Sequence, residues 1–173
     1  MKRNKLLENI APCSLMCYTC GGYEKGAICR LSGELAGYLE GMYEFYETHA
    51  DPDYREHLER FRIFQEELFK LGEAKCGGCR SGIHNGCSIR SCFLLECVQT
   101  HSVDFCGECP EFPCDKVHSV FEEEVYVQWL EGNEKIRESG ADQFWEERRR
   151  MPHYKKYKDT KEYQDRKSTR LNS

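Results

Sequence analysis

The twelve cysteines of this chain constrain its fold more than any other feature of the sequence. They fall into two groups, because residues 30–75 contain none. Thiols this close together form disulfides, take part in redox chemistry or bind metal, and each alternative requires a different kind of fold. The first group is Cys13, Cys17, Cys20 and Cys29, and the second group is Cys76, Cys79, Cys87, Cys92, Cys97, Cys106, Cys109 and Cys114.

The N-terminal segment bears on the redox environment of these thiols. Residues 1–13 carry basic side chains but lack the continuous apolar core of a secretion signal. No window holds the ~18 apolar residues that a membrane span needs. We therefore expect a cytoplasmic protein without a membrane segment. In that reducing compartment, clustered thiols bind metal more often than they form disulfides.

The charge of the chain limits its partners. The formal net charge is −5, and thiolates gathered around divalent ions would make it more negative. A general nucleic-acid binder presents a basic surface, so that class is disfavoured. The basic residues concentrate in the tail 148–173, which we interpret as a solvated terminus. Its last residues, RKSTRLNS, resemble a translated cloning scar and are excluded from the functional inference.

Hydrophobic periodicity predicts a helical hairpin over residues 33–71. Apolar residues recur at helical spacing on both sides of Asp51 and Pro52, a pair typical of a helix N-cap and first turn. Gly72 is a natural helix stop. We expect both stripes to pack as core. The stripes are Leu35, Leu39, Met42, Tyr43 and Tyr46, followed by Tyr54, Leu58, Phe61, Phe64 and Leu68.

These patterns predict a small, mainly α protein that is stabilised by metal. We expect a single domain over residues 1–147, in which Phe144 and Trp145 dock a final short helix. No alternation typical of strands is visible. The predicted segments are a first cysteine loop at 10–30, the hairpin at 33–71, a second cysteine segment at 73–114 and further helices at 115–147.

The first cysteine group has the spacing C-x3-C-x2-C-x8-C. Four thiolates complete a tetrahedral zinc shell, and they equally satisfy an iron–sulfur cluster. The two-residue spacer between Cys17 and Cys20 lets both sulfurs face one ion. The spacing therefore predicts a metal site without selecting the metal.

The second group supplies eight thiols, which is the number that two four-ligand sites need. One partition places Cys76, Cys79, Cys87 and Cys92 on one ion and the other four cysteines on a second ion. A cross-braced pairing of Cys76 and Cys79 with Cys106 and Cys109 is equally allowed by the spacing. Cys97 lies in the apolar run FLLEC, where a buried structural thiol would also fit. His84 and His101 are candidates to replace a thiol as ligand.

The stretch CGECPEFPC, residues 106–114, also resembles a thioredoxin-type C-G-x-C motif. That chemistry needs the first thiolate at a helix N-terminus, where the helix dipole lowers its pKa. Pro110 and Pro113 prevent a continuous helix here and favour extended backbone at Cys109. We therefore expect a stiff loop that presents its thiols to a metal ion, rather than a redox switch.

The ordered motifs APCSLMCYTCGGY, CGGC, CSIRSC and DFCGECPEFPCDK resemble a cysteine-rich bacterial and archaeal domain-of-unknown-function family. The resemblance covers residues 10–145 and implies a zinc-type metal site, but no established reaction and no catalytic residue. The positions that match the family pattern are Cys13, Cys17, Cys20, Cys76, Cys79, Cys87, Cys92, Cys106, Cys109 and Cys114.

We therefore expect a metal-binding protein of unknown biochemical role, with zinc as a structural ion. One alternative is an iron–sulfur protein in electron transfer or anaerobic redox metabolism, which the Cys109-Pro110 pair favours. Another is a protein-interaction module that uses the aromatic hairpin. No phosphate loop, dinucleotide-binding glycine pattern or Ser/His/Asp arrangement is recognisable, so a catalytic role is not favoured.

Overall fold

The computed structural model describes residues 2–49, 51–83 and 92–153. This part of the chain is mainly helical and contains isolated β-bridges but no strand, which confirms the predicted fold class. Cys87, His84 and the tail from residue 154 onward lie outside the described residues. The chain forms two compact units: unit 1 comprises Met1–Thr19 and Ser91–Ser173, and unit 2 comprises Cys20–Arg90. The prediction of a single domain stays a prediction.

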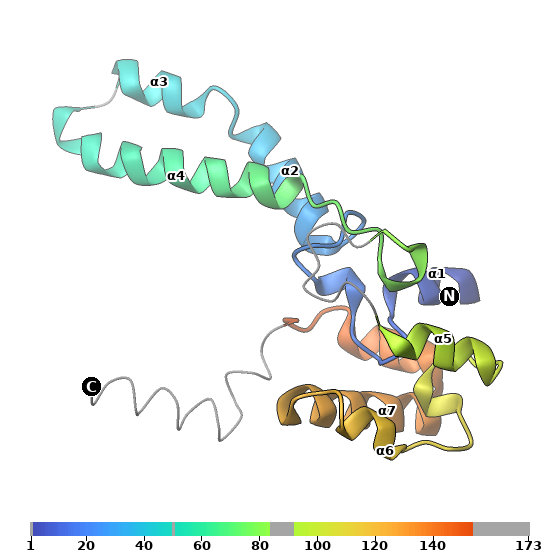
Figure 1. Cartoon of the computed structure of the whole chain (residues 1–173). Coiled ribbons are helices and arrows are strands. Elements are labelled where there is room, and N and C mark those ends of the chain that lie inside the picture. Colours follow the sequence, from blue (N-terminus) through green and yellow to red (C-terminus); the bar gives the residue numbers. More distant parts are fainter. Residues whose placement is uncertain (1, 50, 84–91, 154–173) are drawn as a thin grey trace, which may run out of the picture. The chain divides into compact units, whose positions relative to one another are not determined.

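Unit 2 is built around the helical hairpin, whose helices are labelled in Figure 1. Its first arm starts earlier than predicted and is divided at Gly41, where φ is 75°. The second arm ends at Gly72, as predicted. The helices are α2 (Ala27–Tyr38), α3 (Met42–His49) and α4 (Arg55–Gly72), with short 3-10 helices η2 (Pro52–Tyr54) and η3 (Cys79–Ser81).

Small residues, not the predicted stripe, form the buried face of α2. Cys29, Ser32 and Ala36 are buried, whereas Leu35 is exposed. On α4, Leu58 and Leu68 are buried as predicted, but Phe64 is exposed. The prediction that both stripes pack as core is therefore wrong in part. A pair of helices in contact buries only the stripe that faces the partner, and here α2 presents short side chains.

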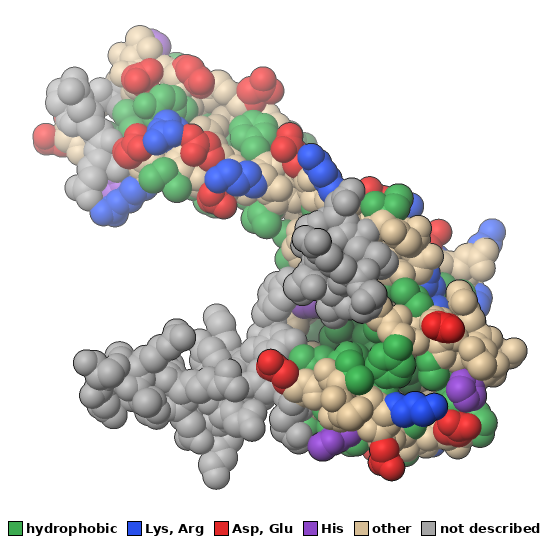
Figure 2. Space-filling view, viewed as in Figure 1, with side chains coloured by type: hydrophobic (Ala, Val, Ile, Leu, Met, Phe, Trp, Pro, Cys, Tyr) green, Lys and Arg blue, Asp and Glu red, His purple; other side chains and the backbone are tan. Residues whose placement is uncertain are grey.

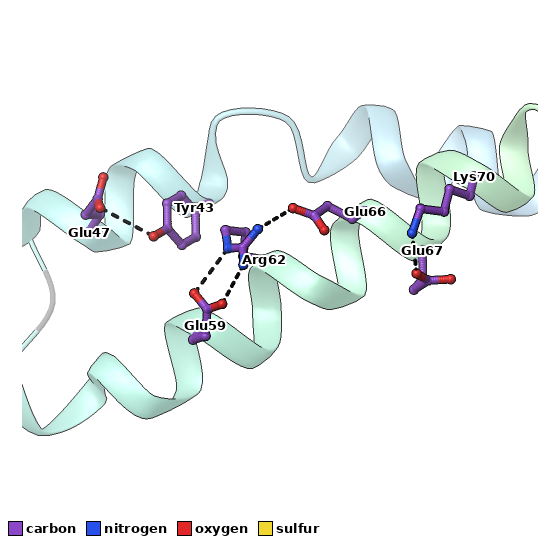
Figure 3. A network of polar contacts seen from close by, with 7 residues as sticks. All are labelled: Tyr43, Glu47, Glu59, Arg62, Glu66, Glu67 and Lys70. Carbon is purple, nitrogen blue, oxygen red and sulfur yellow. Dashed lines mark hydrogen bonds and ion pairs between the residues drawn. The ribbon is translucent and has the colours of Figure 1, made fainter.

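The outer surface of the hairpin carries many ion pairs and exposed aromatic side chains. Figure 3 shows Arg62 between Glu59 and Glu66 on α4, with Lys70 bonded to Glu67 one turn away. In Figure 2, acidic, basic and hydrophobic side chains alternate over this region. Phe45 on α3 is 58% exposed. Solvated pairs of this kind contribute little to stability.

Unit 1 has a core that joins residues from both ends of the chain. Helix α7 is broken at Gly140, where φ is 82°, and Phe144 and Trp145 beyond the break are buried, as predicted for the last helix. The helices are α1 (Arg3–Asn9), α5 (Phe93–Thr100), α6 (Asp115–His118) and α7 (Glu123–Arg148), with 3-10 helices η1 (Cys17–Thr19) and η4 (Cys106–Glu108). The core is Leu6, Ile10, Met16, Phe105, Ile136, Ala141, Phe144 and Trp145.

Candidate metal centre

Four cysteines of unit 1 line one small cavity of about 20 Å³. They are Cys97, Cys106, Cys109 and Cys114, the four that one predicted partition assigns to a single ion. The remaining lining residues are apolar except for His101. All eleven cysteines that the structure describes carry thiols, with no disulfide among them.

Three short elements bring these thiols together. Cys97 lies on α5, Cys106 begins η4 and Cys109 follows its end, while Cys114 is the N-cap residue of α6. Cys109 has φ −72° and ψ 136°, the extended backbone expected of a residue before proline. The η4 turn is closed by the Cys109 amide, which donates to the Cys106 carbonyl at 3.0 Å. Each element is too short to be stable by itself, so the loop depends on outside support.

Helix α7 supplies that support through Arg137. Its guanidinium donates three hydrogen bonds to carbonyl oxygens of the cysteine loop: Nε to Gly107 at 2.9 Å, Nη1 to Phe112 at 3.1 Å and Nη2 to Cys109 at 2.6 Å. The guanidinium carbon also lies 4.7 Å from the centre of the Phe112 ring. One side chain therefore holds three successive parts of the loop.

Two further residues of α7 contact the same loop. The fully buried Asn133 accepts a hydrogen bond from the Gly107 amide at 2.8 Å, and a Cβ at Gly107 would lie 2.2 Å from the Asn133 carbonyl oxygen. Trp129 packs against Phe112, with ring centres 4.9 Å apart. Trp129, Asn133 and Arg137 are spaced by four residues and so lie on one face of the helix. Asn133 and Arg137 were not predicted from the sequence, although this spacing was a usable signal.

Two thiols of the cavity, those of Cys97 and Cys106, have raised pKa values. Burial raises the pKa of Cys106 to about 11, and the Trp129 indole opposes that rise. Burial and the neighbouring Cys114 and Cys109 raise the pKa of Cys97. A redox-active C-G-x-C motif needs a lowered pKa at its first cysteine, so these directions disfavour that chemistry.

Cys13 lies close to a second set of thiols in unit 1. Burial raises its pKa to about 12, and the neighbouring Cys92, Cys106 and Cys17 contribute to the rise. The Cys106 amide donates to the Pro12 carbonyl at 3.0 Å, which ties the two cysteine-rich loops together. The N-terminal half of the first group thus lies among thiols of the second group.

The other described cysteines belong to unit 2. Cys76 forms a bridge with Tyr23, and its amide donates to the Gly22 carbonyl at 3.0 Å, so it lies beside the turn that follows Cys20. Cys29 has a different environment, because its Sγ donates to the Gly72 carbonyl at 3.1 Å. That hydrogen bond needs a protonated thiol. The first group is therefore divided between units, with Cys13 and Cys17 in unit 1 and Cys20 and Cys29 in unit 2.

Four thiols are a donor set that suits a thiophilic ion. In this structure, however, the four sulfur atoms do not lie close enough together to share one ion. Within the described ranges, no three His, Cys, Asp or Glu side chains meet as a metal site requires. Protonated thiols have no mutual attraction, and thiolates repel each other until a cation joins them. The buried Nε1–H of Trp129 has no acceptor at ordinary hydrogen-bonding distance among these residues. An indole N–H beside Cys106 is suited to a thiolate sulfur.

The family model described as "Protein of unknown function (DUF3795)" matches residues 9–119. The chain belongs to the DUF3795 family. This confirms the resemblance inferred from the cysteine motifs. No curated protein and no solved structure matches the chain.

The region matched to DUF3795 contains all four cysteines of the cavity, whereas α7 with its Arg137 lies beyond it. The loop is thus part of the family pattern, and its support comes from the helix that follows. Among the helices of the described residues, none combines the length and apolarity needed to cross a membrane.

Proposed function

We propose that this DUF3795 protein binds a structural zinc ion through Cys97, Cys106, Cys109 and Cys114. The observation that carries the proposal is that four thiols from three separate elements line one cavity. Four thiolates are a complete ligand set for tetrahedral zinc, with no open position for a substrate. The ion would add folding free energy to a loop made of short elements.

The size of the cavity favours a single ion. A volume of about 20 Å³ leaves room for one small ion among the four thiols. A four-iron cluster brings four irons and four sulfides, and this space would have to open widely to take it. For this reason the iron–sulfur alternative ranks below zinc.

The surroundings of the cavity suit metal-bound thiolates. The Trp129 indole N–H beside Cys106 provides a donor for a sulfur that carries negative charge. Arg137 fixes the carbonyl of Cys109 and so orients the backbone on which that ligand sits. Groups that orient ligands in this way commonly affect metal affinity about 10–100-fold when they are removed. The thiol ligands also suit a reducing compartment such as the cytoplasm.

Elemental analysis of protein purified without oxygen tests the proposal. We expect zinc in the wild type, and one zinc per chain fewer in Cys109→Ser. Cys29→Ser is the matched control, because a hydroxyl can replace the thiol that donates to Gly72 and zinc should be retained.

Two results would overturn the zinc assignment. Iron with acid-labile sulfide and visible absorption would establish the iron–sulfur alternative instead. Equal metal content in Cys109→Ser and the wild type would show that the cavity is not a metal site.

The other alternative is a protein-interaction module, which the exposed aromatic side chains of α3 and α4 support. This alternative makes no prediction about metal content.

A further inference from the structure

A second and larger cavity in unit 1 is separate from the four-cysteine cavity. Its volume is about 280 Å³, near the lower end of the ~300–1,000 Å³ typical of small-molecule sites. It lies between the loop that contains Ser14 and two parts of the C-terminal region, namely α7 and residues 151–153. None of its lining residues is a cysteine or belongs to the proposed zinc site.

Two side chains of this cavity, Gln128 and Arg148, offer hydrogen-bond donors. The Nε2 amide of Gln128 is completely buried and has no hydrogen-bond partner. The guanidinium of Arg148 lies 5.7 Å from the centre of the Phe144 ring, and no hydrogen bond or ion pair joins it to another described residue. No Asp or Glu lines the cavity. A buried amide without a partner costs about 1–3 kcal/mol, so its retention calls for an explanation.

The backbone of the cavity wall is held in an unusual conformation. Ser14 is buried with φ 66°, a left-handed conformation that is uncommon for a residue other than glycine. Gly132 of α7 makes room for it, because a Cβ there would lie 2.1 Å from the Ser14 Oγ. Such conformations concentrate at ligand sites, where the surrounding structure maintains them.

The far wall places a histidine beside a threonine. His153 Nδ1 lies 3.3 Å from the Thr19 hydroxyl, and that hydroxyl donates to the Met16 carbonyl at 3.4 Å. Burial lowers the pKa of His153, which keeps the ring neutral near neutral pH. Arg148 is therefore the cationic group among the residues that line the cavity.

We propose that this cavity binds a small monocarboxylate with an apolar body. The planar guanidinium of Arg148 and the amide of Gln128 are donors suited to a carboxylate, which accepts through two oxygens. Leu15, Met16 and Phe144 supply the apolar wall for the rest of the molecule. Inorganic phosphate would leave most of the volume unfilled, so the apolar body is part of the proposal.

Isothermal titration calorimetry of the full chain, loaded with its metal, tests this site. The probes are benzoate and hexanoate, each compared with its uncharged amide. We expect the carboxylates to bind and the amides to bind at least tenfold more weakly. Arg148→Gln should weaken carboxylate binding about tenfold or more, the effect of losing a charge-assisted hydrogen bond. Arg149→Gln is the matched control, because Arg149 pairs with Glu146 and does not line the cavity.

A second variant keeps the test decisive if Arg148→Gln does not fold. Gln128→Glu preserves the side-chain shape but replaces an amide donor of the cavity by a negative charge that repels a carboxylate, so binding should be lost. The proposal is overturned if neither carboxylate binds at millimolar concentration, if the amides bind equally well, or if binding survives in Gln128→Glu. Zinc content is measured on the same samples, so that a lack of carboxylate binding can be distinguished from a lack of bound zinc.

Discussion

At the residue scale, one arginine outside the candidate metal site makes three hydrogen bonds to the loop that carries its thiols. Arg137 bonds the carbonyls of Gly107, Cys109 and Phe112, and stacks on the ring of Phe112. Three carbonyls held by one planar group fix the path of the loop more firmly than three separate donors would. The position of the thiols thus depends on a residue that contributes no ligand.

Replacing Arg137 by glutamine should destabilise the protein and weaken metal retention. A glutamine can restore at most part of the three hydrogen bonds, and we expect a loss of roughly 2–3 kcal/mol in the free energy of unfolding. Urea denaturation followed by circular dichroism measures this loss, and competition with a chelator measures retention. Arg62→Gln is the control, since its ion pairs lie on the solvated surface of α4 and should contribute little. Equal stability of the two variants would contradict the role of Arg137.

At the element scale, the hairpin depends on a close approach of two helices. Gly33 of α2 and Gly72 at the end of α4 pack backbone to backbone, and a Cβ at Gly72 would lie 2.9 Å from the Gly33 Cα. The Cys29 thiol bonds the Gly72 carbonyl at the same contact. Gly72 was expected to stop the helix through its conformational freedom, but the structure shows that its lack of a side chain is what the packing requires.

The two glycines of this contact should respond differently to alanine. Gly72→Ala should cost about 1–3 kcal/mol, because the new methyl group meets backbone that cannot rotate away. In Gly33→Ala the methyl group would lie 3.8 Å from the Gly72 Cα, an ordinary contact. That variant should be neutral or gain up to about 1 kcal/mol from helix propensity. Thermal unfolding of both variants by circular dichroism checks the prediction, which fails if Gly72→Ala is as stable as Gly33→Ala.

At the scale of the whole molecule, the cysteines are grouped by unit and not by order in the sequence. Cys13 and Cys17 lie in unit 1 with five cysteines of the second group, whereas Cys20 and Cys29 lie in unit 2 with Cys76 and Cys79. Each unit therefore combines thiols from both cysteine groups. In unit 1, the hydrogen bond from the Cys106 amide to the Pro12 carbonyl connects the N-terminal loop with the loop that carries the proposed ligands.

Removal of metal should loosen unit 1 locally while leaving the hairpin helix protected. Residues 93–118 contain the proposed ligands on short elements, whereas α4 has 18 residues and packs along α2. Hydrogen exchange measured by mass spectrometry, before and after a strong chelator, should show faster exchange in 93–118 and little change in 55–72. Unchanged exchange in 93–118 would show that metal does not hold this segment.

The sequence by itself determined the helical class, the end of the hairpin at Gly72 and the family. These features depend on local signals, namely helical periodicity, a terminal glycine and ordered cysteine motifs. Such signals are present in the sequence whatever the tertiary arrangement. The extended backbone at Cys109 also followed from the proline after it. Each is specified within a few residues of the chain.

Only the tertiary structure decided which thiols share a cavity and which helix faces are buried. Spacing allowed several partitions of the second group and left open whether Cys97 is a ligand or a buried structural thiol. The structure places Cys97 in one cavity with Cys106, Cys109 and Cys114. The buried face of α2 escaped detection because small side chains give no hydrophobic signal. The loop CGECPEFPC was recognisable from its motif. Arg137, which bonds the backbone of this loop, lies outside it on α7 and could not be found from the motif. Contacts between distant segments depend on packing, which no local pattern records.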